Sequence, residues 1–139
     1  MYGKFIRVID DKNRVTLPTV FKEALGQSIV ITLGFDGNAE IRSFKDFEKY
    51  KENIENQSRF KAETRLLSRF IFGNSYEVKI DSVGRFNIPK IIIDKLTIQK
   101  EISFIGLGNL VEIWSKERLD ELDSNISLTD IVTIAQKVS

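Results

Sequence analysis

The chain contains no cysteine and no histidine among its 139 residues. Disulfide frameworks, thiolate or imidazole zinc sites, cysteine nucleophiles and Ser-His-Asp arrangements are therefore excluded. A GxxxxGK[ST] phosphate loop is also missing, and Gly106 and Gly108 lack the third glycine and the following helix of a dinucleotide site. We therefore predict a protein that is not an enzyme and that uses no metal or cofactor.

Long hydrophobic runs are absent as well. No stretch approaches the roughly 18 apolar residues of a membrane helix, and the first residues, Met1 to Phe5, do not form the apolar run of a secretory signal. Apolar residues make up 42% of the chain and charged residues 29%, which is typical of a soluble globular protein. We expect a cytoplasmic protein with no membrane partner.

Charge of either sign is nearly balanced, with a net charge of +1, so composition alone does not indicate a nucleic-acid partner. The distribution is uneven, however. Residues 110–139 carry three basic and six acidic side chains, which leaves the first 109 residues with a net charge of +4. A weakly basic body with an acidic C-terminal part is compatible with a local DNA-facing surface, and equally with an unevenly charged solvated surface.

The strongest pattern present is an internal repeat. The segment IDDKNRVTLP at residues 9–18 returns as IDSVGRFNIP at residues 80–89, an offset of 71 residues. After a one-residue insertion the match resumes: Gly34, Glu40, Ile41 and Ser43 align with Gly106, Glu112, Ile113 and Ser115. We predict two homologous halves.

Each half predicts the same series of elements. A strand (3–9, then 75–80) leads through a turn into a short return strand, followed by Pro18 or Pro89 and a two-turn helix ending near Leu25 or Leu96. A second hairpin follows at 28–43 and 101–115, and Ser43 and Ser115 are expected to cap the next helices. A longer helix is expected from about Ser58 to Phe72, and an amphipathic segment after Ser127.

These elements predict an α+β fold. Since neither half has enough strand to enclose a core, we expect two pseudo-two-fold related motifs that interleave into one small β-barrel-like domain with flanking helices. We expect a first repeat at 1–54, a connecting helix at 55–74, a second repeat at 75–123 and a C-terminal helix at 124–139.

The repeated turn has the form Asp-x-x-x-Arg, as Asp10 to Arg14 and Asp81 to Arg85. Asn13 and Gly84 precede the arginines, and these two residue types adopt positive φ most easily, as in a hairpin with a G1 bulge. The aspartates can accept hydrogen bonds from N–H groups of the turn. The pattern therefore predicts an arginine on a stiff turn, twice per chain.

Two interpretations of this turn remain open on the residues alone. An arginine fork can bond a guanine edge bidentately or clamp a phosphate, with Lys12, Lys4 and Arg7 adding phosphate contacts. Alternatively, Asp10–Arg14 and Asp81–Arg85 are only ion pairs across the turn, worth at most about 1 kcal/mol.

Three segments carry a resemblance to a known family. The strings IDDKNRVTLP, SRFIFGNSYEVKIDSVGRFNIP and LVEIWSKERL resemble the MraZ family over about residues 1 to 123. The resemblance implies a tandem pair of AbrB-like (SpoVT-AbrB) swapped-hairpin motifs, with Arg14 and Arg85 at the positions of the DNA-contacting arginines. Asn13 departs from the usual glycine, and Gly73-Asn74-Ser75 departs from the usual Ser-Gly-Ala.

The resemblance also implies a function. It indicates a transcriptional regulator of double-stranded DNA that binds promoter repeats upstream of the division and cell-wall gene cluster, including its own gene. Ring-shaped homo-oligomers and association with the nucleoid are implied as well. The alternative within the same superfamily is the antitoxin of a toxin–antitoxin pair, whose C-terminal tail binds a toxin.

Two further patterns have competing explanations. Lys61, Arg65 and Arg69 share one face of the expected central helix, which suits either an anionic partner or ordinary solvation. Four aromatic residues could form a platform that stacks single-stranded bases, although packing in the core or between subunits is favoured. These are Trp114, Phe70, Phe72 and Phe104.

Overall fold

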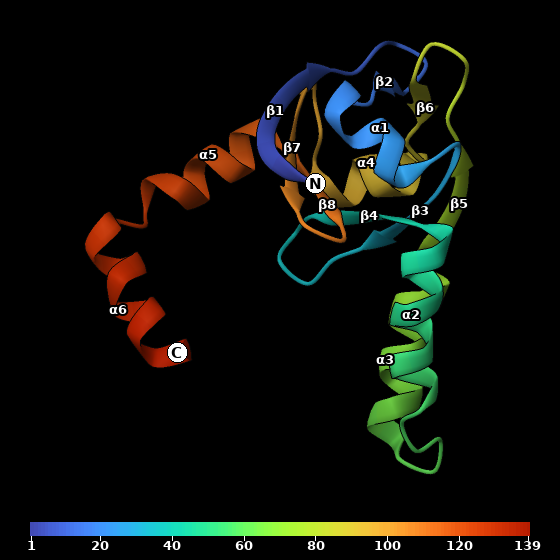
Figure 1. Cartoon of the computed structure of the whole chain (residues 1–139), viewed down its shortest axis with the longest axis vertical. Helices are drawn as coiled ribbons and strands as arrows, with labels where there is room; N and C mark the ends of the chain where they lie inside the picture. Colours follow the sequence, from blue (N-terminus) through green and yellow to red (C-terminus); the bar gives the residue numbers. More distant parts are fainter.

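A computed structural model describes all 139 residues as an α+β fold. The order β-β-α-β-β-α occurs twice, with one helix between the copies and one after them (Figure 1). The elements are β1 (Tyr2–Val8), β2 (Arg14–Thr16), α1 (Thr19–Leu25), β3 (Ser28–Leu33), β4 (Ala39–Ser43), α2 (Phe44–Glu55), α3 (Ala62–Gly73), β5 (Ser75–Lys79), β6 (Arg85–Asn87), α4 (Lys90–Leu96), β7 (Glu101–Leu107), β8 (Val111–Ser115), α5 (Lys116–Ser124) and α6 (Leu128–Val138).

Six strands form one antiparallel sheet in the order β1-β7-β8-β4-β3-β5. The two predicted hairpins, β3–β4 and β7–β8, are present, and they meet along β4 and β8 at the centre of the sheet. The leading strand of each half lies against the hairpin of the other half, β1 on β7 and β5 on β3. The sheet is open, with β1 and β5 at its edges, so the strand pairing does not close into the barrel expected from the sequence.

The short strands β2 and β6 form a separate two-stranded sheet between the halves, in which Val15 lies opposite Phe86. The prediction that each leading strand pairs with its own return strand is therefore wrong, because β1 pairs with β7 while β2 pairs with β6. The exchange has a physical reason. Val15 and Phe86 are both buried in the common core, and pairing across the halves satisfies their backbone groups at the same time.

One hydrophobic core serves both halves. Equivalent positions of the two copies enter it together, as Phe21 and Ile92 or Ile31 and Phe104 illustrate. The full cluster is Val15, Leu17, Phe21, Leu25, Ile29, Ile31, Ala39, Ile41, Phe86, Ile88, Ile92, Ile93, Leu96, Ile98, Ile102, Phe104, Val111 and Ile113. A chain of this length gains more from one shared core than from two very small ones.

The strand register corrects the alignment of the halves. Because Ser43 and Ser115 are equivalent caps, Ile29 opposite Ser43 corresponds to Ile102 opposite Ser115, and Leu33 corresponds to Gly106. The sequence match of Gly34 with Gly106 is therefore one residue out of register. A longer connection between α4 and β7 is partly offset by a shorter turn between β7 and β8.

The centre of the sheet places two carboxylates opposite each other. Glu40 on β4 and Glu112 on β8 are register partners, an arrangement that is unfavourable for like charges. The two carboxylates have different partners. Arg42 forms a 2.9 Å ion pair with Glu40, while Asn38 and the Trp114 indole N–H donate to the two oxygens of Glu112 at 2.9 and 3.0 Å.

The predicted helix caps are largely confirmed. The hydroxyls of Ser43 and Ser115 accept hydrogen bonds from the backbone at the starts of α2 and α5. The central helix begins at Ala62, four residues later than predicted, because residues 58–61 form a turn. Gly26, which follows α1, has a positive φ of 78° and an extended ψ of −159°, so it is not in the left-handed helical conformation.

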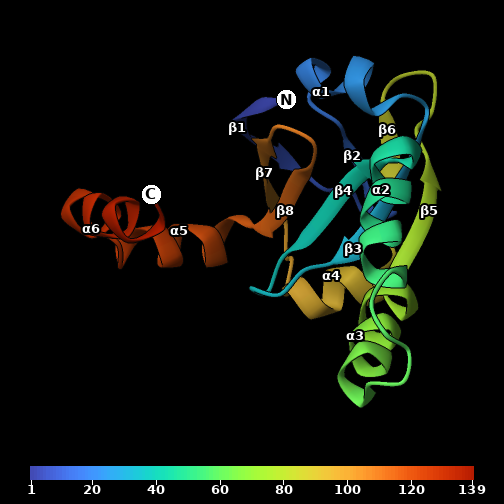
Figure 2. The ribbon, with the colours of Figure 1, turned by 60° about the horizontal axis from the view of Figure 1, so that its bottom comes forward.

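Two helical projections leave the sheet domain in different directions (Figures 1 and 2). The first, which we call the helical hairpin, consists of α2 and α3; the second, which we call the C-terminal arm, consists of α5 and α6. Ser127 and Asp130 form a reciprocal capping box at the start of α6, so the predicted amphipathic helix is present. No helix is long and apolar enough to span a bilayer.

The shared core predicts that the halves unfold together. Replacing buried Ile41 by Ala should lower the free energy of unfolding by about 2–5 kcal/mol, because a cavity forms between β4 and its neighbours. Denaturant unfolding followed by Trp114 fluorescence and by circular dichroism should give coincident single transitions. Val20→Ala, at an exposed position of α1, is the control with a small effect. Two separate transitions would contradict a common core.

Candidate nucleic-acid interface

The first turn is organised by the carboxylate of Asp10. One oxygen accepts hydrogen bonds from the backbone N–H groups of Lys12 and Arg14, both at 2.9 Å. The other accepts from Arg14 Nε, also at 2.9 Å. The turn is closed by two backbone bonds, from Asp10 N–H to the Arg14 carbonyl and from Asn13 N–H to the Asp10 carbonyl. Asp10 therefore fixes both the backbone of the turn and the direction of the guanidinium.

The second turn repeats this geometry with different residues. Asp81 accepts from the N–H groups of Val83 and Arg85 at 3.0 and 2.8 Å, and from Arg85 Nε at 3.0 Å. Gly84 N–H donates to the Asp81 carbonyl. The φ angles of Asn13 and Gly84 are 61° and 87°, so the positive φ predicted at both positions is confirmed.

The two turns are tied to each other across the pseudo-two-fold axis. The Gly84 carbonyl accepts a hydrogen bond from Leu17 N–H, and the Asn13 carbonyl accepts one from Ile88 N–H, each at 2.9 Å. Each turn is thus bonded to the residue that follows the short strand of the other half. The spacing of the two arginines is set by this reciprocal pair of bonds and by the β2–β6 ladder.

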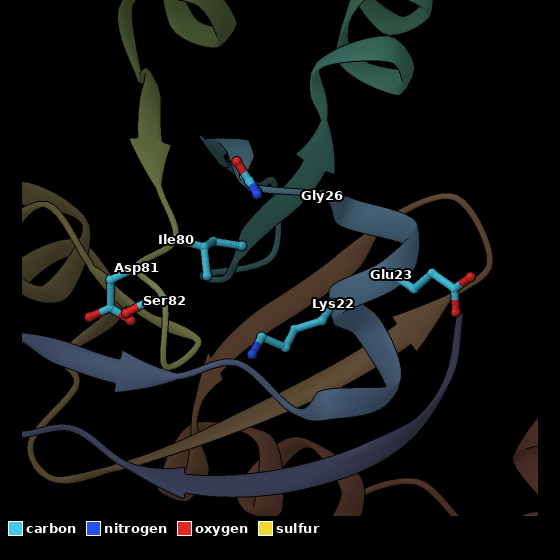
Figure 3. Close-up of a pocket in the computed structure, with 7 residues that line it drawn as sticks. Lys22, Glu23, Gly26, Ile80, Asp81 and Ser82 are labelled. Carbon is cyan, nitrogen blue, oxygen red and sulfur yellow. The ribbon is translucent and has the colours of Figure 1, made fainter.

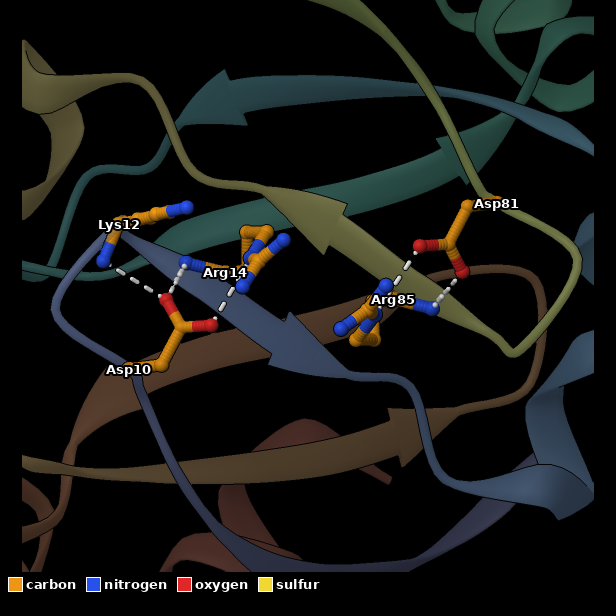
Figure 4. A network of polar contacts seen from close by, with 5 residues as sticks. All are labelled: Asp10, Lys12, Arg14, Asp81 and Arg85. Carbon is orange, nitrogen blue, oxygen red and sulfur yellow. Dashed lines mark hydrogen bonds and ion pairs between the residues drawn. The ribbon is translucent and has the colours of Figure 1, made fainter.

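One surface of the β2–β6 ladder carries both arginines. Val15 and Phe86 point into the core, while Arg14, Thr16, Arg85 and Asn87 alternate with them; these four residues are called the paired-turn face. Arg14 lies opposite Asn87 and Arg85 opposite Thr16. Figure 4 shows the two guanidinium groups between the two carboxylates. The only hydrogen bond of each guanidinium to the protein comes from Nε, which leaves both Nη groups available.

The local hydrogen bonds lower the pKa of both aspartates. For Asp10 the largest cause is the hydrogen bond from Arg14 N–H, and for Asp81 it is the one from Arg85 N–H. The ion pairs with the arginine side chains act in the same direction. Both carboxyl groups are therefore ionised at neutral pH, as an acceptor of three donors must be.

The other basic residues predicted for the site are placed unequally. Lys12 is exposed at the tip of the first turn. Arg7 on β1 donates from Nη1 to the Ile6 carbonyl, and its guanidinium carbon lies 5.8 Å from the centre of the Phe5 ring. Lys4 forms a 3.0 Å ion pair with Asp123 on α5. Lys12 is thus the predicted lysine that lies in the turn itself.

Two hollows adjoin the turns. One, of about 420 Å³, borders the paired-turn face and is lined mainly by Arg14, Arg85, Asn87 and the end of β5. The other, of about 590 Å³, lies behind the second turn between Lys22 and Glu23 of α1 and residues 80–82 (Figure 3). Most of the residues that line the two hollows have polar or charged side chains.

The structure decides in part between the competing explanations of the aromatic residues and of the basic residues on the central helix. Trp114 and Phe104 are 4% and 0% exposed, so they pack in the interior and form no stacking platform. Phe70 is stacked on Phe35 at a ring-centroid distance of 5.9 Å. Arg65 Nη1 donates to the carbonyls of Arg59 and Phe60, where it supports the turn before α3.

Sequence reasoning did not single out Thr16 and Asn87. Both are exposed on the paired-turn face directly opposite an arginine. The triplets Arg-Val-Thr and Arg-Phe-Asn could have indicated them, because the first and third residues of a strand lie on the same face. Only the cross-half pairing shows that the two triplets share a single face.

The fold and the site together define a class of protein. It is a duplicated α+β chain that carries two arginine-bearing turns on one face. The family model described as "MraZ protein, putative antitoxin-like" matches this chain twice, over residues 5–70 and 71–137. The chain belongs to the MraZ family. Each half thus matches the same model, as the repeated element order suggests.

Several relatives are similar over nearly their whole length. A protein of Mycoplasma mobile is 38% identical over 88% of this chain and 84% of its own. Proteins of Mycoplasmopsis pulmonis and Ureaplasma parvum are 36% and 38% identical, over 99% and 98% of this chain and 94% of their own. All three are named "Transcriptional regulator MraZ".

The lowered pKa values predict a specific acid sensitivity. Since the folded-state pKa of Asp10 and Asp81 lies below the ordinary value near 3.8, their stabilisation is complete above that pH and is lost as the pH falls through the lowered pKa. We expect the difference in free energy of unfolding between the wild type and the Asp10→Asn, Asp81→Asn double variant to be constant from about pH 7 to 5. The same difference should shrink below about pH 4. Denaturant titrations of both proteins at each pH measure it. If the difference did not change with pH, the two ionised aspartates would not be the source of the stabilisation.

Proposed function

We propose that this chain is a sequence-specific DNA-binding regulator of transcription without enzymatic activity. The observation that carries the proposal is the paired-turn face, on which two guanidinium groups are held at fixed spacing with their Nη groups unbonded. The relatives named as transcriptional regulators support it. The turns enter the major groove, where the guanine O6 and N7 atoms accept two hydrogen bonds from an arginine fork.

The aspartates act as positioning residues in this proposal. Asp10 and Asp81 bind only the Nε side of each guanidinium, so the carboxylate orients the fork without occupying its outer edge. An arginine with its torsions already fixed loses less conformational entropy on binding than a free surface arginine. The interpretation as a mere ion pair explains the Asp–Arg distances, but it gives no role to the Nη groups that both arginines leave free.

The remaining residues of the proposed interface have distinct roles. Lys12 at the first tip contacts phosphate, as does Arg7 at the rim, whereas Lys4 must exchange Asp123 for DNA before it can contribute. Asn87 is suited to an adenine edge and Thr16 to a base or phosphate oxygen. Lys61, at the N-cap of α3, and Arg65 and Arg69, on α3, are assigned no DNA contact.

The family resemblance supplies the target. We propose repeated promoter sequences upstream of the division and cell-wall gene cluster, including the chain's own gene, and a location in the cytoplasm at the nucleoid. The exchange of β1 and β5 between the halves supports assignment to the AbrB-like swapped-hairpin motifs, with boundaries near residues 54, 74 and 123. A single pair of turns has a small footprint, so repeated sites favour several linked subunits.

Exposed apolar surface on the two projections supports a homo-oligomer. No residue of α6 is buried, although Leu128 (80% exposed) and Ile131, Val132, Ile134 and Val138 are apolar. The helical hairpin exposes Phe60 (98%), Leu66 and Leu67. An isolated 11-residue helix is marginal in water, so α6 needs a partner. The C-terminal arm carries more acidic than basic residues, whereas α3 carries Arg65 and Arg69 against Glu63, and this difference favours a head-to-tail contact that closes a ring.

A second candidate function uses the same arm. The family description as antitoxin-like and the uncovered apolar face of α6 are compatible with an antitoxin that binds a toxin through its C-terminal part. A toxin would then occupy α6, and the purified chain alone would keep α6 exposed. The assembly state of the purified chain separates the two functions.

The arginines should determine sequence preference and not stability. Arg14→Ala and Arg85→Ala are each expected to remove about 1–3 kcal/mol of operator affinity per engaged subunit, with little change in melting temperature. The measurements are selection of DNA from a random library by the wild type, titration of the selected duplex, and thermal unfolding. Asp10→Ala should lower stability more than Arg14→Ala, because three hydrogen bonds lose their acceptor.

Arginine-to-lysine variants provide the matched control for charge. Lysine keeps the positive charge but lacks the fork, so these variants should retain non-specific affinity and lose discrimination between the selected duplex and a scrambled one. If both lysine variants discriminated as well as the wild type, the arginines would only neutralise phosphates and would not read bases. Unaltered affinity in both alanine variants would overturn the proposed function itself.

The apolar face of α6 should control assembly and multivalent binding. Sedimentation of the purified chain should show one discrete oligomer, and Ile131→Asp should produce smaller species because a charge enters the contact. Thr133→Asp, on the opposite face of α6, is the matched control. The wild type should bind DNA with several repeats far more tightly than DNA with one, with a steep salt dependence, and Ile131→Asp should lose this gain. A monomeric wild type would favour the antitoxin candidate.

A further inference from the structure

The two turns have the same backbone but different side chains at their tips. Lys12 in the first turn corresponds to Val83 in the second, and both backbone N–H groups donate to the aspartate of their own turn. Val83 is 60% exposed. An isolated exposed valine is ordinary on a protein surface. This one, however, is two residues before Arg85, in a turn that the proposed function places against base edges.

The rigidity of the turn makes the position of Val83 well defined. Its N–H is bonded to Asp81 Oδ1 at 3.0 Å, and the same oxygen fixes Arg85 N–H at 2.8 Å. A β-branched side chain also has few accessible rotamers. Asp81 therefore fixes both residues, Val83 through its backbone N–H and Arg85 through its backbone N–H and Nε, so the exposed apolar side chain and the guanidinium belong to one rigid turn.

A second difference lies behind the turns. Lys22 on α1 extends to the second turn, where a Cβ atom built on Gly84 would lie 2.8 Å from Lys22 Nζ. None of the ion pairs of the structure involves Lys22. Figure 3 shows its side chain directed toward the loop of Asp81 and Ser82. The corresponding position behind the first turn is Ile93, which is buried in the core.

We propose that the two turns recognise different features of DNA, and that Val83 contacts the C5-methyl group of a thymine beside the base bound by Arg85. The thymine methyl is the apolar feature of the major groove, and valine is the apolar residue exposed on this turn. Lys22 supplies to the second turn the phosphate contact that Lys12 supplies to the first. The two half-sites are thus unequal, and each subunit docks with one polarity. This inference rests on the proposed function.

Removal of single methyl groups from the DNA tests the contact. The probe is the duplex selected from a random library by the full-length protein, with each thymine replaced in turn by deoxyuridine. One replacement should weaken wild-type binding about four-fold per engaged subunit, the effect of one buried methyl-sized group. For Val83→Ala the same replacement should have almost no effect, because the partner of the methyl group is already gone.

The controls separate this contact from general weakening. Val20→Ala, an equally exposed valine on α1, should keep the full deoxyuridine effect. Val83→Ala should keep the wild-type melting temperature. If no replacement discriminates between the wild type and Val83→Ala while Arg14→Ala and Arg85→Ala still lose affinity, this inference fails and the proposed function stands. If the arginine variants also bind normally, the proposed function fails as well.

Variants of Lys12 and Lys22 test the direction in which each subunit docks on the two half-sites. In hydroxyl-radical footprints, Lys22→Ala should reduce backbone protection in the half-site that contains the Val83-dependent thymine, and Lys12→Ala in the other half-site. Each variant should also reduce the slope of log affinity against log salt concentration by about the amount expected for one lost phosphate contact. Lys49→Ala, on exposed α2, is the control without effect. Equal loss in both half-sites, or no loss with Lys22→Ala, would overturn the unequal assignment.

Discussion

Backbone hydrogen bonding between the halves is the constraint on which the rest of this structure depends. In neither half does β1 or β5 pair with the short strand that follows it; each finds its partner on the hairpin of the other half. The strands β2 and β6 pair with each other, and their turns exchange bonds through Leu17 and Ile88. Because buried backbone groups must be paired, the halves cannot separate without exposing all the strand ladders between them and the common core.

The same constraint creates the candidate site. Since β2 and β6 pair about a pseudo-two-fold axis, Arg14 and Arg85 are brought from positions 71 residues apart to one small surface. Asp10 and Asp81 then fix each guanidinium through Nε. These exposed ion pairs contribute little to stability, and their effect is to limit the directions that the forks can take. The rigidity of the scaffold is thereby passed to side chains that would otherwise be mobile.

Duplication has produced similar halves with unequal surroundings. Glu40 is neutralised by Arg42, whereas Glu112 is held by Asn38 and the Trp114 indole. The turns differ in the same way, with Lys12 at one tip and Val83 at the other. The core positions and the turn backbone have remained equivalent because both halves share one interior. The exposed positions are free of that requirement, and specificity for an asymmetric sequence can develop there.

The amino-acid sequence by itself determined the duplication, the α+β class, the caps at Ser43 and Ser115, and the positive φ of Asn13 and Gly84. All of these follow from short-range chemistry: spacing, capping and local steric limits. The identity of the strand partners was decided only by the tertiary structure. An alternating strand such as β1 suits its own return strand or β7 equally well, and the shared burial of Val15 with Phe86 selects between them. For the same reason, Thr16 and Asn87 became visible as neighbours of the arginines only once the two halves were paired.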